Sequence, residues 1–551
     1  MAKKLQKADL QSLPVCVSEF IKQVIKKMRY RKKVQADVAA ELIAHFQDEL
    51  KECSTDGQKE QKAQLLIDGF GDIKMLAVLL RRAKKRCRPL WRILVARGFQ
   101  TAGLLILCLI VYIAWFLTGK PVITTNYIEE YNRIVRPAAD ESLNAAPLYE
   151  KAIELYEVSS DDASELIGKK YYEAAPEEKQ AMEKWLSDNR DIFDMVIAGS
   201  KKPYCWFENE YDENNKNMMA AVLVPNLSGF RRLAYALRWR VWINSEKGRY
   251  QDAFDDIKAC YRLGRHLKGN KTIIAQLVGV AIEALAVQEL RSIVSQHKIE
   301  SAILAALQKD FEQMVADEDF VVRLDVERLS TYDAIQRCFT EDRLGKGHII
   351  FEVPNVLLSM EEGLGLSNYS IFEKFLRVPL HILFTHPNKQ QTREMADRFY
   401  AFYDEIAQKS PGQFHSEAID IEKEAAEIIR GNILLEILTP LIHRMYELSY
   451  RNKTDVEATL VIIAILRYNQ DVGDYPENLE QLVTAGYIKE IPLDSFSDNK
   501  PLVYKKTDDN FLLYSFGENL KDDGGEIALD DKGKAKKWAD EGDWVFWPVQ
   551  N

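Results

Sequence analysis

An uncharged apolar segment of 22 residues, from Gly98 to Gly119, constrains the fold of this chain more than any other feature. About 20 residues of α-helix cross the roughly 30 Å hydrocarbon layer of a bilayer. The segment GFQTAGLLILCLIVYIAWFLTG has that length, and Tyr112 and Trp115 lie toward one end, where interfacial aromatic residues are typical. We therefore expect one transmembrane helix over residues 99–118.

The charges on either side of this segment predict its orientation. Residues 1–98 hold 22 of the 74 Lys and Arg and 11 of the 84 Asp and Glu, which leaves 52 against 73 for residues 99–551. No acidic residue occurs between Asp72 and Glu129, whereas basic residues crowd the N-terminal flank. The positive-inside rule then predicts a cytoplasmic N-terminus, with residues 120–551 outside. The acidic balance of that larger part argues against a nucleic-acid partner.

A second apolar run, residues 272–290, is not expected to span a membrane. It carries two glutamines and two glutamates, among them Glu283 in the middle of an apolar helix. Burial of that carboxyl would raise its pKa, although a hydrogen-bonded structural acid is the more common role of such a residue. The prediction is a single-pass chain.

The sequence pattern of residues 15–86 predicts four helices before the transmembrane helix. The stretch VQADVAAELIAHFQDELKEC has apolar residues four apart, on one face of a helix, and a Gly-Asp break separates two later helices. The ELIAHFQDEL helix and the DGFGDIKMLAVLL ending resemble the HAAS and permease-prefix domains that precede transmembrane helices. The resemblance implies a cytoplasmic helical signalling or interaction module over residues 1–90. The apolar face consists of Val34, Val38, Leu42, Phe46 and Leu50.

Residues 125–455 have mainly amphipathic helical patterns and predict an irregular helical domain. At residues 233–267 an aromatic-rich helix meets Gly248-Arg249-Tyr250, and Ala253 opens a second helix. This junction resembles that of tetratricopeptide hairpins, but a 34-residue period does not persist. The helical spacing of the aromatic residues predicts core positions rather than a ligand platform. These residues are Tyr235, Trp239 and Trp242.

Residues 456–551 predict a small α+β module, in which a helix precedes two strand-like runs, PLVYKK and NFLLYSFG, joined by a polar turn at residues 507–510. This order resembles the globular head of type II secretion pseudopilins. Ser495 stands where that family has Pro, and Gly103 stands where prepilin processing at Gly98-Phe99 would need Glu. The matching features are Tyr468, the turn at Gly473, Tyr475 and Pro476, then Pro492, Asp494, Tyr504, Tyr514, Ser515 and Gly517.

The chain as a whole resembles uncharacterised single-pass membrane proteins of planctomycete-type bacteria. That resemblance implies the inner (cytoplasmic) membrane, with the bulk of the chain extracytoplasmic.

An acidic loop in the last segment is the predicted metal site. Asp522, Asp523 and Asp543 supply hard oxygen donors, and Gly524-Gly525 lets backbone carbonyls turn inward, as calcium sites require. Pseudopilin heads bind calcium in the corresponding loop, which the resemblance extends to this chain. The alternative is a solvated acidic turn without a cation.

Other catalytic or binding motifs are absent from the sequence. Neither GxGxxG, GxxxxGK[ST] nor HExxH occurs. His381, His386 and His443 are expected to be core or surface histidines. Three of the seven scattered cysteines lie beyond the span, so at most one disulfide is possible there within a monomer.

We expect a membrane-anchored, non-enzymatic interaction or scaffold protein with protein partners, and the sequence identifies no small-molecule substrate. Helical hairpin domains offer concave surfaces for such partners. Two alternatives remain open: an extracytoplasmic hydrolase with a carboxylate-based site, and an accessory component of a secretion or envelope assembly.

Overall fold

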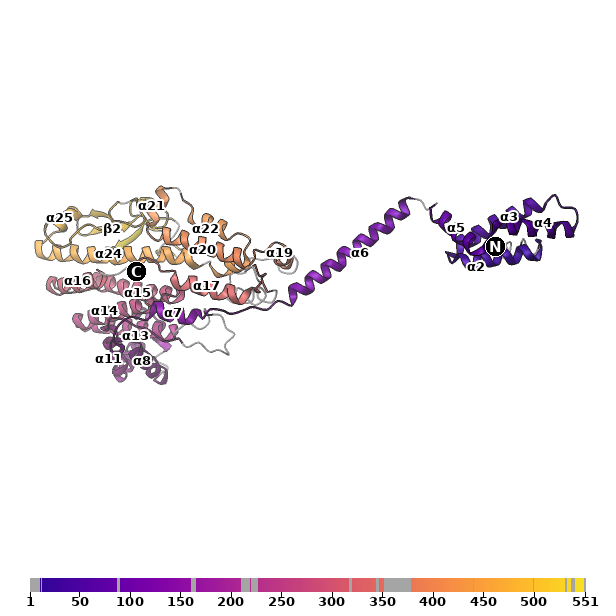
Figure 1. Cartoon of the computed structure of the whole chain (residues 1–551). Helices are drawn as coiled ribbons and strands as arrows, with labels where there is room; N and C mark the ends of the chain where they lie inside the picture. Colours follow the sequence, from indigo (N-terminus) through magenta and orange to yellow (C-terminus); the bar gives the residue numbers. More distant parts are fainter. Residues whose placement is uncertain are drawn as a thin grey trace. The chain divides into compact units, whose positions relative to one another are not determined.

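The computed structural model divides into two compact units, Met1–Ala114 and Trp115–Asn551, which we call the N-terminal unit and the C-terminal unit. The prediction of a mainly helical fold with a small sheet near the C-terminus is confirmed (Figure 1). The structure describes residues 10, 12–86, 90–159, 165–209, 219, 226–316, 320–342, 346–350, 378–417, 419–439, 441–498, 500–530, 533–536 and 541–549.

The N-terminal unit contains the four predicted helices and most of α6. The predicted apolar face of α3 is confirmed, because Val38 and Phe46 are fully buried and Phe46 packs edge-on against Phe20 of α2. Gly71, with a φ of +71°, separates α4 from α5 at the predicted break. The helices are α2 (Val15–Met28), α3 (Lys32–Leu50), α4 (Asp56–Phe70), α5 (Ile73–Arg86) and α6 (Leu90–Leu117).

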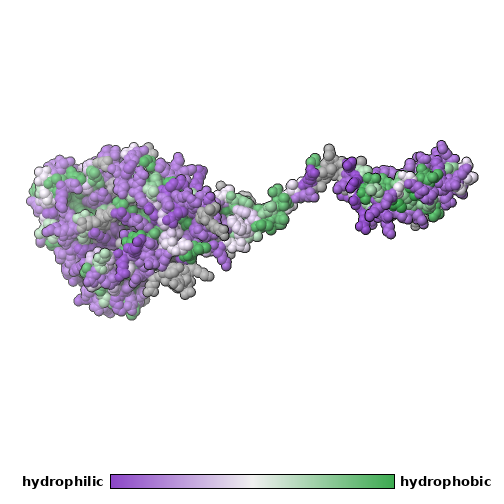
Figure 2. Space-filling model, in the orientation of Figure 1, coloured by the Kyte–Doolittle hydropathy of each residue, from purple (hydrophilic) through white to green (hydrophobic). Residues whose placement is uncertain are grey.

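Among the described residues, two helices are long and apolar enough to cross a membrane by length and composition alone. One is residues Arg97–Leu117 of α6, whose side chains are almost all exposed; Figure 2 shows hydrophobic side chains along it. The other is α15 (Ile273–Gln296), most of which is buried inside the C-terminal unit. Burial in the packed core accounts for the apolar residues of the second helix, and of these two only Arg97–Leu117 presents unburied apolar side chains along nearly its whole length.

The C-terminal unit is built of packed helical layers. α14 (Tyr250–Lys268) lies between α13 (Leu227–Glu246) and α15, and α24 (Leu441–Val472) packs on the other side of α15 (Figure 1). At one end α8 (Ala146–Val158) and α11 (Arg190–Ser200) pack together, and α11 also contacts α14. At the other end the sheet and α25 (Leu479–Thr484) pack on α24.

Further helices complete the C-terminal unit. α16 packs on α24, and α17 packs on both α7 and α20. They are α7 (Tyr127–Val135), α10 (Pro176–Asp188), α11 (Arg190–Ser200), α16 (Ser301–Val315), α17 (Asp325–Cys338), α19 (Val378–Phe384), α20 (Lys389–Ile406), α21 (Pro411–Ser416), α22 (Ile421–Ile429), α23 (Ile433–Leu438) and α25 (Leu479–Thr484), with the 3-10 turns η1 (Glu141–Leu143), η2 (Leu166–Gly168) and η3 (Tyr171–Glu173).

The predicted hairpin between α13 and α14 is present, with Gly248 at a φ of +68° and Ala253 fully buried. Trp239 and Trp242 lie in the core, as expected from their spacing, and Tyr235 packs against it. The next contact, between α14 and α15, is unusually close. A Cβ atom on Gly264 would lie 2.5 Å from the carbonyl oxygen of Gly279, so both positions need glycine for the two backbones to approach.

The sheet is antiparallel with the order β1-β2-β3. β1 (Val503–Lys506) and β2 (Phe511–Ser515) form the predicted hairpin, closed by a bond from the Thr507 amide to the Asn510 carbonyl. β3 (Trp544–Trp547) comes from the final DWVFWP segment, for which no strand was predicted.

The division at residues 455 and 456 falls inside α24. Side chains from residues 145–314 and from residues 456–547 belong to one hydrophobic core. The sheet therefore shares its core with the helical layers rather than enclosing a separate one.

Candidate functional site

The predicted calcium loop is organised around the Asp543 carboxylate, which is 5% exposed. Its two oxygens accept the backbone N–H groups of Asp523, at 3.2 Å, and Gly525, at 2.6 Å. Asp522 accepts the hydroxyl of Tyr514 at 2.8 Å. Burial raises the pKa of Asp543, and the nearby carboxylates of Asp523 and Asp522 add to the effect, although the two N–H bonds lower it.

The loop thus brings the three predicted acids together, but as hydrogen-bond acceptors that close the turn. Among the described residues, no group of three or more His, Cys, Asp or Glu side chains is placed to hold a metal ion. Calcium ligation by Asp522, Asp523 and Asp543 therefore stays a prediction.

The residues that carry the pseudopilin resemblance lie around a second buried acid. The Asp494 carboxylate, 2% exposed, accepts the Ser515 hydroxyl at 2.7 Å and the amides of Phe496 and Phe516 at 3.0 and 2.9 Å. Tyr504 donates its hydroxyl to the Pro476 carbonyl at 2.6 Å. These bonds join the loop before β1 to the end of β2, so the motif residues have a structural role.

The other residues considered from sequence also have structural partners. Glu283 is fully buried and pairs with Lys268 of α14 at 2.8 Å and with the Asn452 amide of α24 at 2.7 Å. His381 contacts the Gly431 carbonyl at 2.8 Å, and burial lowers the pKa of His386 to about 4. The side chain of His443 lies outside the described residues.

The junction at the C-terminal end of α6 is a first feature that sequence analysis missed. The His348 ring stacks on Phe116 at 4.3 Å between centroids, and its Nε2 contacts the Phe116 carbonyl at 3.0 Å. Because that carbonyl lies in the last turn of α6, it has no partner further along the helix, and the imidazole supplies one. A Cβ on Gly119 would lie 2.2 Å from the Thr340 methyl group, so the chain leaves the helix in close contact with this segment.

The residues after the helix are also bonded to the C-terminal unit. The Gln336 side-chain oxygen accepts the backbone N–H groups of Thr124 and Thr125, both at 3.2 Å, and its nitrogen donates to the Thr125 carbonyl at 2.9 Å. Pro121 forms an isolated bridge with Thr340. The described residues from Phe116 to Thr125 are therefore bonded into the C-terminal unit to which they belong.

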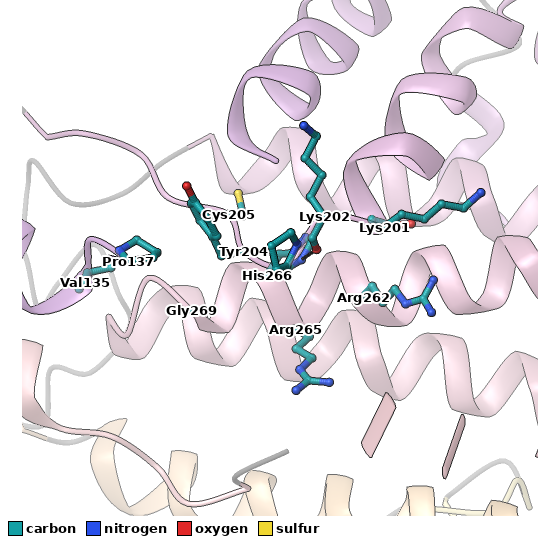
Figure 3. A pocket seen from close by; sticks show the side chains of 12 residues that line it. Val135, Pro137, Lys201, Lys202, Tyr204, Cys205, Arg262, Arg265, His266 and Gly269 are labelled. Atoms are coloured by element: carbon teal, nitrogen blue, oxygen red, sulfur yellow. Dashed lines mark hydrogen bonds between the residues drawn. The ribbon is translucent and has the colours of Figure 1, made fainter. Parts of the chain in front are cut away.

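A cavity of about 500 Å³ is a second feature that sequence analysis missed. Lys201 and Lys202 follow the C-terminus of α11, and Arg262 and Arg265 project from the last turns of α14 (Figure 3). None of the described residues that line the cavity is Asp or Glu. The remaining lining residues are Val135, Pro137, Ser200, Pro203, Tyr204, Cys205, His266 and Gly269.

His266 fixes one wall of this cavity. Its Nδ1 lies 2.8 Å from the Tyr149 hydroxyl and its Nε2 lies 3.0 Å from the Lys202 carbonyl. Since a carbonyl only accepts, Nε2 carries the proton and Nδ1 accepts from Tyr149. Burial lowers the pKa of His266 to about 4, with a further lowering from the Arg265 and Arg262 charges, so the ring is neutral near pH 7.

The cavity was not predictable from local patterns, because its residues come from three segments between positions 135 and 269. Lys201-Lys202 and the RLGRHLK sequence are ordinary helix-end cations when taken separately. Cys205, Cys260 and Cys338 are buried and free, in keeping with isolated structural thiols.

Comparison with known proteins gives no relative for this chain. No family model matches it, and no match appears among the curated proteins or the solved structures.

Proposed function

We propose that this protein is a single-pass, membrane-anchored interaction protein whose C-terminal unit is a docking platform held next to the bilayer. The observation that carries the proposal is the junction, in which His348 and Gln336 fasten the end of α6 and the next residues to the folded unit. A binding surface on a long flexible linker would need none of these bonds. A platform kept close to the membrane would need such bonds.

The topology follows from the charges. The basic flank before α6 and the acidic balance after it favour a cytoplasmic N-terminal unit and an extracytoplasmic C-terminal unit, in the bacterial inner membrane. The prefix-like helical bundle would anchor the chain or report on binding outside. In a narrower form of the proposal, the sheet module recruits the chain to a secretion or envelope assembly.

A carboxylate-based hydrolase receives less support from the geometry. His266, the imidazole in the wall of the cavity described above, has both ring nitrogens engaged and a pKa of about 4. A general base works best with a pKa near the operating pH and with a free nitrogen facing the substrate.

Cross-linking in intact cells tests the proposal. A membrane-impermeant amine cross-linker is applied, and the tagged chain is then purified in mild detergent. We expect a reproducible adduct of defined mass that requires residues 119–551, judged against a variant that retains only the N-terminal unit and α6. Recovery of the full chain without any adduct would contradict a role as a docking platform.

A second variant isolates the junction. Eight Gly and Ser residues inserted after Thr118 keep the span and the C-terminal unit but separate them. We expect the same fold and membrane fraction with a weaker adduct, because the platform is no longer held near the bilayer. An adduct of unchanged yield would show that the fastening has no part in the interaction.

A further inference from the structure

The cavity between α11 and α14 concentrates positive charge in an otherwise acidic part of the chain. Lys201, Lys202, Arg262 and Arg265 contribute four positive charges, and the described lining residues contribute no negative one. The C-termini of α11 and α14 also meet here, and each carries about half a negative charge from its helix dipole. The two helix ends together therefore offset about one of the four positive charges, which leaves an excess of about three positive charges.

Two of the four cations have partners that account for their positions. The Lys202 ammonium donates to the Ser142 carbonyl, and the Arg265 guanidinium donates to the Met314 carbonyl. The side chains of Arg262 and Lys201 make no hydrogen bond or ion pair with any described residue, and in Figure 3 they extend to the same side of the cavity. These two are free to contact a ligand.

Acidic residues near the cavity stay at its edge. Glu150 is close enough to raise the pKa of the Cys205 thiol, which burial raises first. Glu141 and Asp140 lie near Tyr204, whose hydroxyl donates to the Asp140 carbonyl at 2.7 Å. None of the three lines the cavity, and none forms an ion pair with Arg262 in the described part of the chain.

The opposite part of the lining is apolar. The lining includes Val135, Pro137, Pro203 and Tyr204, and in Figure 3 Val135, Pro137 and Tyr204 lie on the other side of His266 from Arg262. A volume of about 500 Å³ is within the range of small-molecule sites, roughly 300–1,000 Å³. The site therefore combines a cationic side, an apolar side and room for a molecule larger than a simple inorganic ion.

We propose that this cavity binds a small organic phosphate, with the phosphate on Arg262 and Lys201 and an apolar or aromatic body against Tyr204 and the two prolines. A phosphate monoester carries close to two negative charges near pH 7, which matches two unpaired cations. The planar guanidinium offers paired donors with the geometry of phosphate oxygens. The site goes beyond the docking role and does not depend on it.

Calorimetric titration of the full chain in a neutral detergent tests the site, with phenyl phosphate as the probe. We expect saturable binding that is tighter than that of inorganic phosphate, no binding of phenol, and weakening when salt is raised from about 0.05 to 0.5 M. Absence of saturable heat from phenyl phosphate at low salt would overturn the proposal.

Variants place the binding at the cavity. Arg262→Gln and Lys201→Gln should each weaken phenyl phosphate binding by about tenfold or more, and Arg262→Lys by less, because one charge-assisted contact is lost or weakened. Arg398→Gln is the matched control, since the Arg398 side chain is exposed on α20 and has no hydrogen bond or ion pair with a described residue. An equal loss of affinity in Arg398→Gln, or unchanged affinity in both Lys201→Gln and Arg262→Gln, would contradict the assignment. Because Lys201 is exposed, we expect Lys201→Gln to keep the fold.

A lipid head group is a second source of the same chemistry. The titration is repeated in nanodiscs of zwitterionic lipid and of lipid with an anionic phosphate head group. Competition by the anionic lipid alone identifies the head group as the occupant, and unchanged phenyl phosphate affinity in both identifies a free phosphate ester.

Discussion

α6 and α15 have similar lengths and similar apolar composition, yet their surroundings are opposite. α6 exposes nearly all its side chains between Arg97 and Leu117, whereas most of α15 is enclosed by the C-terminal unit. The difference lies in the polar residues. The apolar stretch of α6 contains no charged residue. In contrast, α15 carries several charged residues that are buried and have partners on other helices.

Those partners connect α15 to the layers on both of its sides. Glu283 bonds to Lys268 and Asn452, and Glu289 accepts the Trp242 indole N–H at 2.6 Å. Arg291 pairs with Asp455 of α24 at 3.0 Å. Apolarity alone therefore does not separate a span from a core helix; buried charges with specific partners on neighbouring helices do.

The largest effect is expected from breaking one of these pairs. Lys268→Met leaves the fully buried Glu283 carboxylate without its cation, and we expect a loss of about 3–5 kcal/mol in the unfolding free energy of the C-terminal unit. Denaturant unfolding in detergent micelles, followed by tryptophan fluorescence, measures this loss of unfolding free energy.

Two further variants control this prediction. Lys309→Met, at an exposed lysine of α16, should change the unfolding free energy by less than about 0.5 kcal/mol. Lys268→Met combined with Glu283→Leu should recover much of the loss, because no unpaired charge stays buried. If Lys268→Met alone unfolds at the same denaturant concentration as the native chain, α15 is not held by this pair.

An arginine substitution should affect α6 more than α15. Leu107→Arg places a charge at the middle of α6 and should cost about 2.5–3.5 kcal/mol of membrane insertion. Ile274→Arg, at a position of α15 that is 45% exposed, should leave insertion unchanged. The measurement is the fraction of chain that resists alkaline extraction from membranes, with Leu107→Ile as the control. Equal losses for both arginine variants would mean that α15 also lies in the bilayer.

Buried polar groups of the C-terminal unit should also respond to acid. The pKa of His266 in the folded chain is about 4, below its value of 6.5 in an unfolded chain, so the unfolded state binds the proton first as pH falls. Stability is thus full above about pH 6.5 and is lost toward pH 4, by about 2–3 kcal/mol at pH 4.5. In His266→Gln this component disappears, which the difference in unfolding free energy between pH 7 and pH 4.5 measures. An equal pH difference in the variant and the native chain would contradict the assigned neutral ring.

A smaller effect is expected at the junction. Gln336→Ala removes the partners of the Thr124 and Thr125 amides, and we expect about 1–2 kcal/mol of lost protection there. Hydrogen exchange of residues 119–126 measures this loss, and Gln390→Ala, at an exposed glutamine of α20, is the control. Unchanged exchange would mean that the chain after α6 is held by other contacts.

Local periodicity was sufficient to predict much of the fold. The apolar face of α3, the α13–α14 hairpin, the β1–β2 hairpin and the core position of Trp239 each depend on residues close in sequence. The β3 pairing, the Arg291–Asp455 pair and the junction do not, because their partners lie up to 232 residues apart, as for His348 and Phe116. The cavity was missed for the same reason, and the acidic loop was predicted as a group of residues without its hydrogen-bond pattern.

Protease protection in spheroplasts tests whether α6 is the only span. The chain carries one epitope tag at each end, and protease is added outside before and after the membrane is permeabilised. With α6 alone crossing, the C-terminal tag is lost in intact spheroplasts and the N-terminal tag survives on a fragment that includes the four-helix bundle. If α15 also crossed, the chain would return to the cytoplasm and the C-terminal tag would survive until permeabilisation, which would contradict the single-span account.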